Sequence, residues 1–521
     1  MGRKSINRRE FFKVSSVALA GGYLGLKTAA ASGGRMGGGG GMGGGGGGGM
    51  GGGGGVIDPP LGPLFQDPAE MPNIVPGVPG LVEVNMEARA AVVDINGTPA
   101  NLLTYNSLYP APTIRVRKGD LLRVHFTNSI PPGGTNLLGH AMDVTNLHTH
   151  GLHVSPSGKA DNVMLAWWPG DSFTYEYDLS LQDGGSLNFY HPHIHGTVAE
   201  QYWKGLAGAI VVEDEVSALG GYETHVMTLK DIDLSGSEPA PYAMMMDYMH
   251  GKEGNIVMVN GQVNPELRIR PGQVQRWRVL NASNARFYHL SLEGHPMMYL
   301  VGSDGGLLDR PYPISRILLS PGERVDLLVK ADQASAKYRL LSLPYSRMGA
   351  NSGQQVTLLT LSYKGSRSNQ GIPSMIDPEA RRVNAMPMAI RSLALGMGQG
   401  RGYINGITFE GMDQAYRIAS HTGTWEEWEI ANDSGMDHPF HQHTNPCQVL
   451  AISGGDSGYA SIYTSAPAWK DTVIVPKWGS IRILIPVKDY GGMAMFHCHI
   501  PEHEDIGMMG VWDIMGGMGG M

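Results

Sequence analysis

The chain has 521 residues with only two cysteines, 17% charged residues and a formal net charge of −8. Two cysteines exclude a disulfide-rich scaffold and a cysteine-rich zinc module, and an ordinary apolar share of 42% excludes a disordered chain. Glycine is frequent, at 75 residues, and much of the excess lies in residues 33–55. The remaining excess is typical of turn-rich β proteins.

Residues 1–31 are predicted to be an export signal. A basic start is followed by the apolar stretch Val14–Leu26, which is too short to cross a bilayer, and by small residues at Ala29–Ala31. The run Asn7–Lys13 contains two adjacent arginines and resembles a twin-arginine signal; an ordinary secretory signal is the alternative. We therefore expect a periplasmic or secreted protein that is exported by the twin-arginine route.

Removal of this signal changes the charge of the chain. The signal contains six basic residues and one acidic residue, so the mature chain has a net charge of −13. That balance argues against a nucleic-acid partner and is compatible with cationic substrates or metal ions. No later stretch reaches 18 apolar residues, so we expect no stable membrane insertion.

Residues 32–57 form a Gly/Met-rich segment of low complexity, which is predicted to be a tether, and residues 515–521 repeat this composition. Because thioethers are soft ligands that select Cu(I), both segments are candidate copper-collecting arms. The alternative is compositional drift in a tether. The internal cluster Met244–Met249 is interpreted either as a further Cu(I) site or as part of a packed core.

From about residue 82 the sequence consists of short β-like runs separated by Gly, Pro, Asn and Asp, without long helical periodicity. Thr113–Asn128 and Glu266–Asn281 alternate apolar and polar residues around a glycine-containing turn, which predicts the same hairpin used twice. Trp478–Val487 is a weaker version of it. The pattern predicts an all-β chain of three β-sandwich domains. Their expected bounds are 58–215, 220–365 and 385–514, with a linker at Gly365–Arg382.

Most of the 19 histidines fall into four tight clusters. On a strand, residues i and i+2 point to the same face about 7 Å apart, so each His-x-His pair presents two imidazoles to one place. Eight imidazoles suit copper, zinc, iron or nickel. The four pairs are His148/His150, His191/His193, His441/His443 and His497/His499.

The last cluster narrows the choice of metal. Cys498 lies between His497 and His499, so on a strand its side chain points to the opposite face and is available to a second metal. A zinc site does not need a thioether, and an iron–sulfur site needs more thiolates. Two histidines, one cysteine and a distant methionine form the ligand set of a blue-copper site. The residues that complete this set are His438, Cys498, His503 and Met508.

In these four motifs the chain resembles the three-domain multicopper oxidases of the laccase family, over residues 80–515, and the run His503–Met509 is similar to that of bacterial copper efflux oxidases. The resemblance implies three consecutive cupredoxin-like Greek-key β-sandwich domains and four copper ions: one type 1, one type 2 and two type 3. It implies type 1 ligands His438, Cys498, His503 and Met508, type 2 ligands His148 and His441, and type 3 ligands His150, His191 and His499 on one ion and His193, His443 and His497 on the other.

The resemblance also implies the reaction. Electrons from a reductant enter at the type 1 copper and pass through Cys498 to its bonded neighbours, and dioxygen is reduced to water at the other three ions. Glu504 and Asp161 resemble acids that deliver protons in the family; the alternative for each is an ordinary hydrogen-bonded acid.

The reductant is left open by the sequence. Phenols, aromatic amines or Cu(I) are expected, with a role in copper tolerance, and oxidation of iron or manganese is an alternative within the same fold. Residues 365–400 contain only four methionines, whereas the copper efflux oxidases have a Met-rich insert in this part. A periplasmic copper-sequestering resistance protein is the alternative from another class. We expect a monomer whose partners are dioxygen and a small reductant.

Three further residues carry expectations. His195 is an extra histidine in the second cluster and is expected beside the coppers or in a channel. Cys447 has no partner once Cys498 binds copper, and is expected to be a small buried hydrophobic residue. Asp437 either orients a substrate beside His438 or is a plain loop acid.

Overall fold

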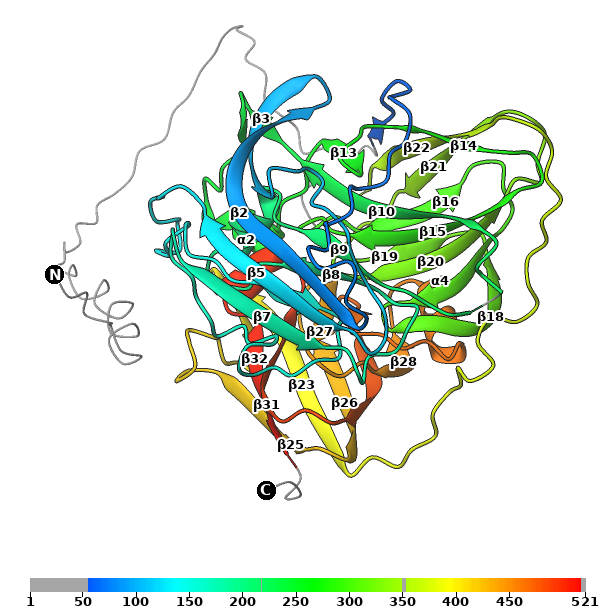
Figure 1. Cartoon of the computed structure of the whole chain (residues 1–521). Helices are drawn as coiled ribbons and strands as arrows, with labels where there is room; N and C mark the ends of the chain where they lie inside the picture. Colours follow the sequence, from blue (N-terminus) through cyan, green and yellow to red (C-terminus); the bar gives the residue numbers. More distant parts are fainter. Residues whose placement is uncertain (1–54, 217, 349–352, 517–521) are drawn as a thin grey trace, which may run out of the picture. The chain divides into compact units, whose positions relative to one another are not determined.

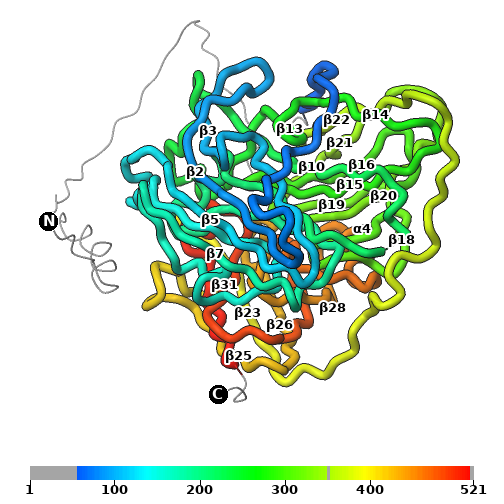
Figure 2. The backbone as a smooth tube through the Cα atoms, viewed as in Figure 1, coloured from blue at the N-terminus to red at the C-terminus, as the bar shows by residue number. Residues whose placement is uncertain are grey.

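The structure is a computed structural model that describes residues 55–216, 218–348 and 353–516 (Figures 1 and 2). The predicted export signal, nearly all of the tether and the end of the Met/Gly tail lie outside the described residues. The described chain forms three β-sandwiches of two sheets each, which confirms the predicted all-β fold class. Its helices are all too short or too polar to span a membrane.

The first sandwich contains two four-stranded sheets. In β5 the side chains alternate between partly exposed and buried positions, as expected for a strand with one face on the core. One sheet has the order β3 (Thr98–Tyr105), β2 (Leu81–Ile95), β5 (Leu121–Ser129), β7 (Ser172–Asp178), and the other β4 (Ile114–Val116), β9 (Gly208–Val212), β8 (Leu187–His191), β6 (His148–His150).

The second sandwich is the largest. All eight residues of β15 are buried, because this strand lies in the middle of its sheet and is covered on both faces. One sheet has the order β13 (Ile256–Val259), β10 (Glu223–Ile232), β15 (Val274–Asn281), β20 (Arg324–Lys330), β17 (Met298–Ser303), β18 (Gly306–Ile314). The other has the order β1 (Val56–Ile57), β22 (Gln355–Tyr363), β21 (Lys337–Leu343), β16 (Tyr288–Leu292), β19 (Ile317–Leu319), with β14 (Glu266–Ile269) also on β22. A small ribbon of β11 (Leu234–Ser235) and β12 (Glu238–Pro239) stands apart.

The third sandwich shares one continuous hydrophobic core with the second. Its sheets have the orders β24 (Arg401–Ile404), β23 (Ala389–Gly398), β26 (Thr424–Asn432), β30 (Ser480–Val487), β28 (Gln448–Ser453), and β25 (Tyr416–His421), β32 (Met509–Met515), β31 (Gly492–Cys498), β27 (His438–Gln442), β29 (Thr472–Val475). Short helices fill the connections: α2 (Val198–Trp203), α3 (Met245–His250), α4 (Ser457–Ser465) and α5 (Pro501–Asp505).

The predicted hairpins are wrong, although the repetition is real. In Thr113–Asn128, β4 and β5 belong to different sheets, and the same holds for β14 and β15 and for β29 and β30. The turn between the two strands is tight, and Gly119 and Gly272 adopt the positive φ of 88° and 77° that such turns require. A tight turn is therefore compatible with a chain that crosses from one sheet of a sandwich to the other, and alternation alone does not tell the two arrangements apart.

The start of the described chain packs on the second sandwich, not on the first. Val56 and Ile57, which were predicted to end the tether, form β1 and pair in parallel with β22. Gly62 and Phe65 then donate backbone hydrogen bonds to Asn264 and Glu266. Residues 364–388, which include the predicted linker, contain no helix or strand and run from the second to the third sandwich in yellow-green in Figure 2.

Candidate metal centre

The four His-x-His pairs lie at neighbouring strand ends of the first and third sandwiches. Pairing of β6 with β8 sets His148 opposite His191, and pairing of β27 with β31 sets His441 opposite His497. Only the first pair lies wholly on a strand, since the second member of each other pair follows the last strand residue. The imidazole centroids within the pairs are still 5.0–6.1 Å apart, so all eight rings, the eight-histidine group, gather in one place.

Three of these rings converge on one point. The Nε2 atom of His497 lies 3.2 Å from Nε2 of His193 and 3.3 Å from Nε2 of His443. Nitrogens held about 2.0–2.1 Å from one metal at tetrahedral angles lie about 3.3 Å apart. The spacing therefore fits three ligands of a single ion, and these are the three residues that the resemblance assigns to one type 3 copper.

The other five rings have nitrogens without any hydrogen-bond partner. Such an atom costs about 1–3 kcal/mol when it is buried and unsatisfied, so a cluster of them indicates a site that binds a metal ion. His148 lies in one potential metal group with His441 and His443 and in another with His150 and His191. The unpartnered atoms are His148 Nε2, His150 Nδ1, His191 Nε2, His441 Nε2 and both ring nitrogens of His499.

The opposite ring nitrogens are held by oxygen atoms. His148 Nδ1 lies 2.9 Å from Asp161 Oδ2, and His191 Nδ1 lies 2.8 Å from the Pro192 carbonyl. His150 Nε2 is 3.0 Å from Asp471 Oδ1. Such contacts fix which nitrogen of each imidazole is free to bind a metal.

Burial also sets the protonation of these rings. It lowers the pKa of His191 and His499 well below the usual value, and neighbouring imidazoles add to the effect. Burial likewise lowers the pKa of His497, to about 3. A neutral imidazole is the form that binds metals, so the site is ready for cations near neutral pH.

A second group lies on the other side of Cys498. Its Sγ is 3.4 Å from His438 Nδ1 and 3.5 Å from His503 Nδ1, and these two nitrogens are 3.1 Å apart. Metal–sulfur and metal–nitrogen bonds of about 2.3 and 2.0 Å give a separation of about 3.5 Å. The chain turns after α5 so that the carbonyl of Met508 accepts a hydrogen bond from Cys498 N, and the Met508 side chain is buried. We call these four residues the blue-copper group.

The outer nitrogens of the blue-copper group are also held. His438 Nε2 lies 2.8 Å from Ser434 Oγ, and His503 Nε2 lies 3.3 Å from the Met249 carbonyl at the end of α3. Burial raises the pKa of the Cys498 thiol above its usual range, so a bound cation is required to hold it as the thiolate.

The two predicted acids lie directly against ligand rings. Glu504 is 3.3 Å from His193 Nδ1 and 3.2 Å from His497 Nδ1, and burial raises its pKa well above the usual range. Asp161, besides its contact with His148, accepts a hydrogen bond from the backbone of Thr149.

The structure also shows the surroundings of the three further residues. The ring of His195 lies against Phe409, with 4.9 Å between centroids, and its Nδ1 has no partner. Cys447 is a free, fully buried core residue, as predicted. Asp437 is buried and accepts hydrogen bonds from Tyr345 Oη and from Lys477 N, which favours the alternative of a structural loop acid.

Sequence reasoning missed Asp471, which lies against two rings of the eight-histidine group. No motif marks it, because a single acid between Lys470 and Thr472 looks like any strand-edge residue. Only the pairing of β29 with β27, which sets Thr472 opposite His441, brings it to the site.

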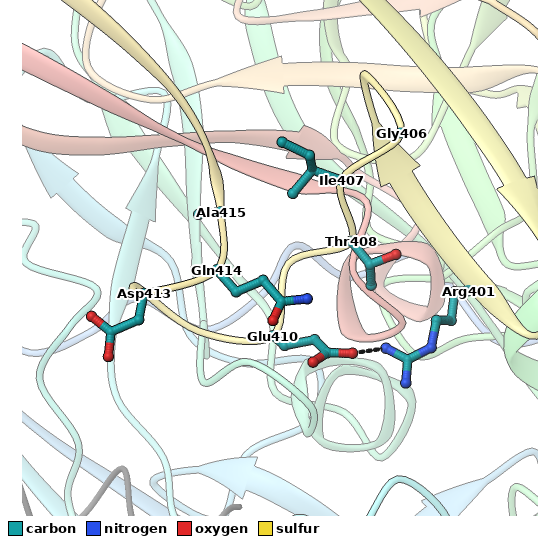
Figure 3. Close-up of a pocket in the computed structure, with 8 residues that line it drawn as sticks. All are labelled: Arg401, Gly406, Ile407, Thr408, Glu410, Asp413, Gln414 and Ala415. Atoms are coloured by element: carbon teal, nitrogen blue, oxygen red, sulfur yellow. Dashed lines mark hydrogen bonds and ion pairs between the residues drawn. The ribbon is translucent and has the colours of Figure 1, made fainter.

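An open pocket lies on the chain that covers α5 (Figure 3). Gly402 and Phe409 donate backbone hydrogen bonds to Ile506 and Gly507, just before Met508. An ion pair of Arg401 with Glu410 crosses the pocket, so its lining is polar.

Comparison with known proteins agrees with this geometry. Three multicopper oxidase family models match residues 87–217, 222–366 and 383–516. A laccase of Bacillus subtilis is 28% identical over 83% of this chain and 94% of its own length. A cell division protein, FtsP, of Xenorhabdus nematophila is 27% identical over 78% of this chain and 83% of its own length.

A solved structure gives the same result. The multicopper oxidase of Campylobacter jejuni, described as a metallo-oxidase, superposes with a TM-score of 0.76 and 26% identity, over 89% of this chain and 98% of that one. The three matched segments each cover most of one sandwich, and the first and last contain the histidine pairs. The chain therefore belongs to the multicopper oxidase family, and membership implies copper-dependent oxidoreductase activity with dioxygen.

Proposed function

We propose that this protein couples one-electron oxidation of a small reductant at the blue-copper group to four-electron reduction of dioxygen to water at the eight-histidine group. Copper ions bound at these residues, four in the family pattern, supply the one-electron redox changes and the place where dioxygen is reduced. The observation that carries the proposal is the position of Cys498. Its Sγ lies in one group while its bonded neighbours, His497 and His499, belong to the other.

The chain itself supplies three things for this reaction. The peptide from Cys498 to its neighbours is a covalent path between the two groups, so no mobile carrier is needed. The ligand rings are almost fully buried, which keeps water away from the reacting centre. We propose that Glu504 hands protons to the site, because its carboxyl lies between two ligand rings. Asp161 is proposed to orient His148, whose Nδ1 it faces.

Cuprous ion is the reductant that the geometry favours. Near the end of helix α3, the carbonyl of Met249 faces His503 Nε2 at the outer edge of the blue-copper group. The start of the helix presents Met244, Met245 and Met246, which are 58%, 39% and 48% exposed instead of packed in a core. Soft thioethers in this position select Cu(I). The balanced reaction is four Cu(I), one dioxygen and four protons giving four Cu(II) and two waters.

The test compares reductants side by side. Oxygen uptake by the copper-loaded protein is measured with Cu(I), a phenol, Fe(II) and Mn(II). We expect the highest kcat/KM for Cu(I). Met245→Leu with Met246→Leu should raise KM for Cu(I) several-fold and leave KM for the phenol unchanged, because leucine keeps the volume and removes the thioether.

The matched control uses two exposed methionines that lie between the predicted linker and β23. Met386→Leu with Met388→Leu should leave both KM values unchanged, since these side chains are 89% and 77% exposed and lie before β23. An equal KM for Cu(I) in all variants would exclude α3 as the entry point and favour a laccase-like phenol oxidase, the activity named for the Bacillus subtilis relative.

Absence of oxygen uptake with every reductant would favour copper sequestration. It would equally favour a non-oxidase role such as that named for the cell division relative. Bound copper would then be retained without turnover. We further propose that the protein acts as a monomer in the periplasm or outside the cell, exported by the twin-arginine route, and contributes to copper tolerance. Loss of export on replacement of both Arg8 and Arg9 by lysine would support that route.

A further inference from the structure

The second sandwich touches the eight-histidine group although it supplies none of its ligands. Among the described residues, every potential metal group is built from the first and third sandwiches alone. The turn between β19 and β20, residues 320–323, nevertheless reaches the ligand rings. A Cβ atom on Gly322 would lie 2.8 Å from the ring of His499, so this turn packs directly on that imidazole.

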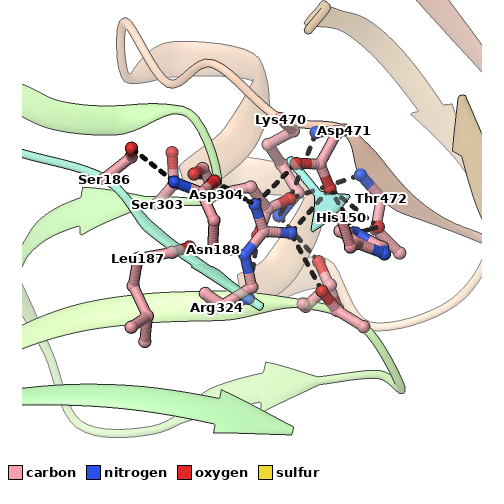
Figure 4. A network of polar contacts seen from close by, with 12 residues as sticks. His150, Ser186, Leu187, Asn188, Ser303, Asp304, Arg324, Lys470, Asp471 and Thr472 are labelled. Carbon is pink, nitrogen blue, oxygen red and sulfur yellow. Dashed lines mark hydrogen bonds and ion pairs between the residues drawn. The ribbon is translucent and has the colours of Figure 1, made fainter. Parts of the chain in front are cut away.

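Arg324, which follows this turn as the first residue of β20, forms a forked pair with Asp471 of the third sandwich (Figure 4). Its Nη1 lies 2.6 Å from Asp471 Oδ1, and its Nη2 lies 2.6 Å from Oδ2. Both side chains are buried. A two-bond contact of this kind fixes the plane of the carboxylate as well as its distance.

Asp471 in turn holds two rings of the eight-histidine group. Its Oδ1 lies 3.0 Å from His150 Nε2, and its carbonyl oxygen lies 2.9 Å from His441 Nδ1. The nitrogens left over, His150 Nδ1 and His441 Nε2, have no partner and are free for a metal. The orientation of both imidazoles therefore depends on where the Asp471 backbone and carboxylate are placed.

The Arg324 guanidinium packs closely against the backbone next to His150. A Cβ atom on Gly151, the next residue, would lie 2.4 Å from Arg324 Nη2 and 2.9 Å from Asp471 Oδ2. Arg324 Nε also donates to the carbonyl of Leu187 in the first sandwich. One side chain of the second sandwich is thus bonded to both of the sandwiches that supply ligands.

Arg324 is itself fixed by alternating charges. Asp304 accepts a hydrogen bond from Arg324 N, and Lys470 Nζ lies 2.8 Å from Asp304 and 2.8 Å from Glu323. Burying such a network is costly, and apolar residues of similar volume would often stabilise a fold as well or better. Fold stability alone is therefore a weak reason for these charges at this place.

We propose that Arg324 is a positioning residue for the copper cluster: by fixing Asp471, it sets the orientation of His150 and His441 for metal binding. The second sandwich thereby acts on the site without contributing a ligand. This inference rests on the metal-binding part of the proposed function and not on any reductant. Its test is copper binding, so a failure of the oxidase activity leaves it testable.

The test is Arg324→Lys, which keeps the charge and removes the fork. Loss of a residue that orients a ligand typically lowers metal affinity about 10- to 100-fold. We expect a loss of that size for the eight-histidine group, measured by competition with a chelator and by electron paramagnetic resonance. The blue absorption of the Cys498 site should persist in the same sample, because Arg324 has no contact with that group.

The matched control is Arg276→Lys. Arg276 lies on β15 of the same sheet, is buried, and forms a forked pair with Asp326, in which Nε lies 3.0 Å from Oδ1 and Nη2 lies 2.5 Å from Oδ2. It should lose similar thermal stability and keep its copper. Equal loss of copper in both variants, or wild-type affinity in a folded Arg324→Lys protein, would overturn the proposal.

Should Arg324→Lys not fold, Thr472→Val decides the question. The Thr472 hydroxyl donates to Asp471 Oδ1 and lies 3.2 Å from His150 Nε2. Removing it loosens the same carboxylate without unpairing a buried charge. Weaker copper binding at the eight-histidine group supports the proposal, and wild-type binding contradicts it.

Discussion

The two metal groups differ in how many sandwiches they need. The blue-copper group is formed by His438 from β27, Cys498 from β31 and two residues around α5, all within the third sandwich. The eight-histidine group takes four rings from the first sandwich and four from the third, and the second sandwich fixes Asp471 between them. The first group is completed by one domain, whereas the second exists only when the domains are docked.

The contrast has a physical consequence for stability. A ligand that binds only the docked state stabilises docking by mass action, about 4 kcal/mol at a thousandfold excess over Kd. Copper in the eight-histidine group should therefore join domains, while copper in the blue-copper group should stabilise one domain only. Variants that empty one group at a time separate these two effects.

Cys498→Ser should have the largest effect. It removes the only thiolate of the blue-copper group and with it the covalent start of the electron path. We expect the blue absorption and oxygen uptake to be lost with every reductant, while copper remains in the eight-histidine group. Copper analysis together with absorption spectroscopy checks this. Loss of all copper would show that the two groups do not form independently.

Glu504→Gln should slow turnover at the eight-histidine group and leave the blue absorption unchanged. A positioned proton donor contributes about 10²- to 10⁴-fold in rate, so oxygen uptake should fall within that range. The control is Glu502→Gln on the same helix, since Glu502 is equally buried but accepts from Tyr242 and from Lys252 N. Unchanged uptake in Glu504→Gln would contradict a proton role for this carboxyl.

Asp161→Asn should weaken copper at His148. The amide is a poorer acceptor for His148 Nδ1, so we expect about a 10- to 100-fold loss of affinity for an ion held by His148. Asp489→Asn provides the control, because Asp489 faces His153 Nε2 at the same 2.9 Å but His153 is in none of the potential metal groups. Equal copper affinities in the two variants would exclude an orienting role for Asp161.

Cys447→Ala should have the smallest effect and confirm that only one cysteine serves a metal. Cys447 is buried in the core beside Lys470, and its replacement leaves a small cavity. We expect a loss of about 1 kcal/mol in unfolding free energy and unchanged copper content. A loss of copper would show that core packing here controls the sites.

The residues that could hold a metal were recognisable in the sequence because they sit in short motifs. The i, i+2 spacing of His497 and His499 around Cys498 carries the geometry within three residues, and the structure places these side chains as expected. The number of sandwiches was predictable for a similar reason, since each begins a new series of short runs with turn residues.

The rest depends on contacts that are distant in sequence. Arg324 and Asp471 are 147 positions apart in the sequence, and no local sequence pattern predicts a forked pair between them. Only the fold, which brings the start of β20 close to the start of β29, shows it. The hairpin prediction was wrong for a related reason. Alternation of apolar and polar residues shows which face of a strand is buried, but it does not show to which sheet the strand belongs. The exposure of the α3 methionines could not be predicted from the sequence either, because a stretch of six residues does not show which side of a helix is buried.

Because β1 pairs with β22, the first sandwich is inserted, in the sequence, between the first strand of the second sandwich and its other strands. The edge strand of the second sandwich leaves the ribosome first, and its partner follows about 300 residues later. A shortened protein that begins at residue 55 keeps that sheet whole, whereas one that begins at residue 67 removes its edge. Truncation of the Gly/Met-rich tether should therefore stop before Val56. A label attached at that point lies beside the second sandwich, not beside the first.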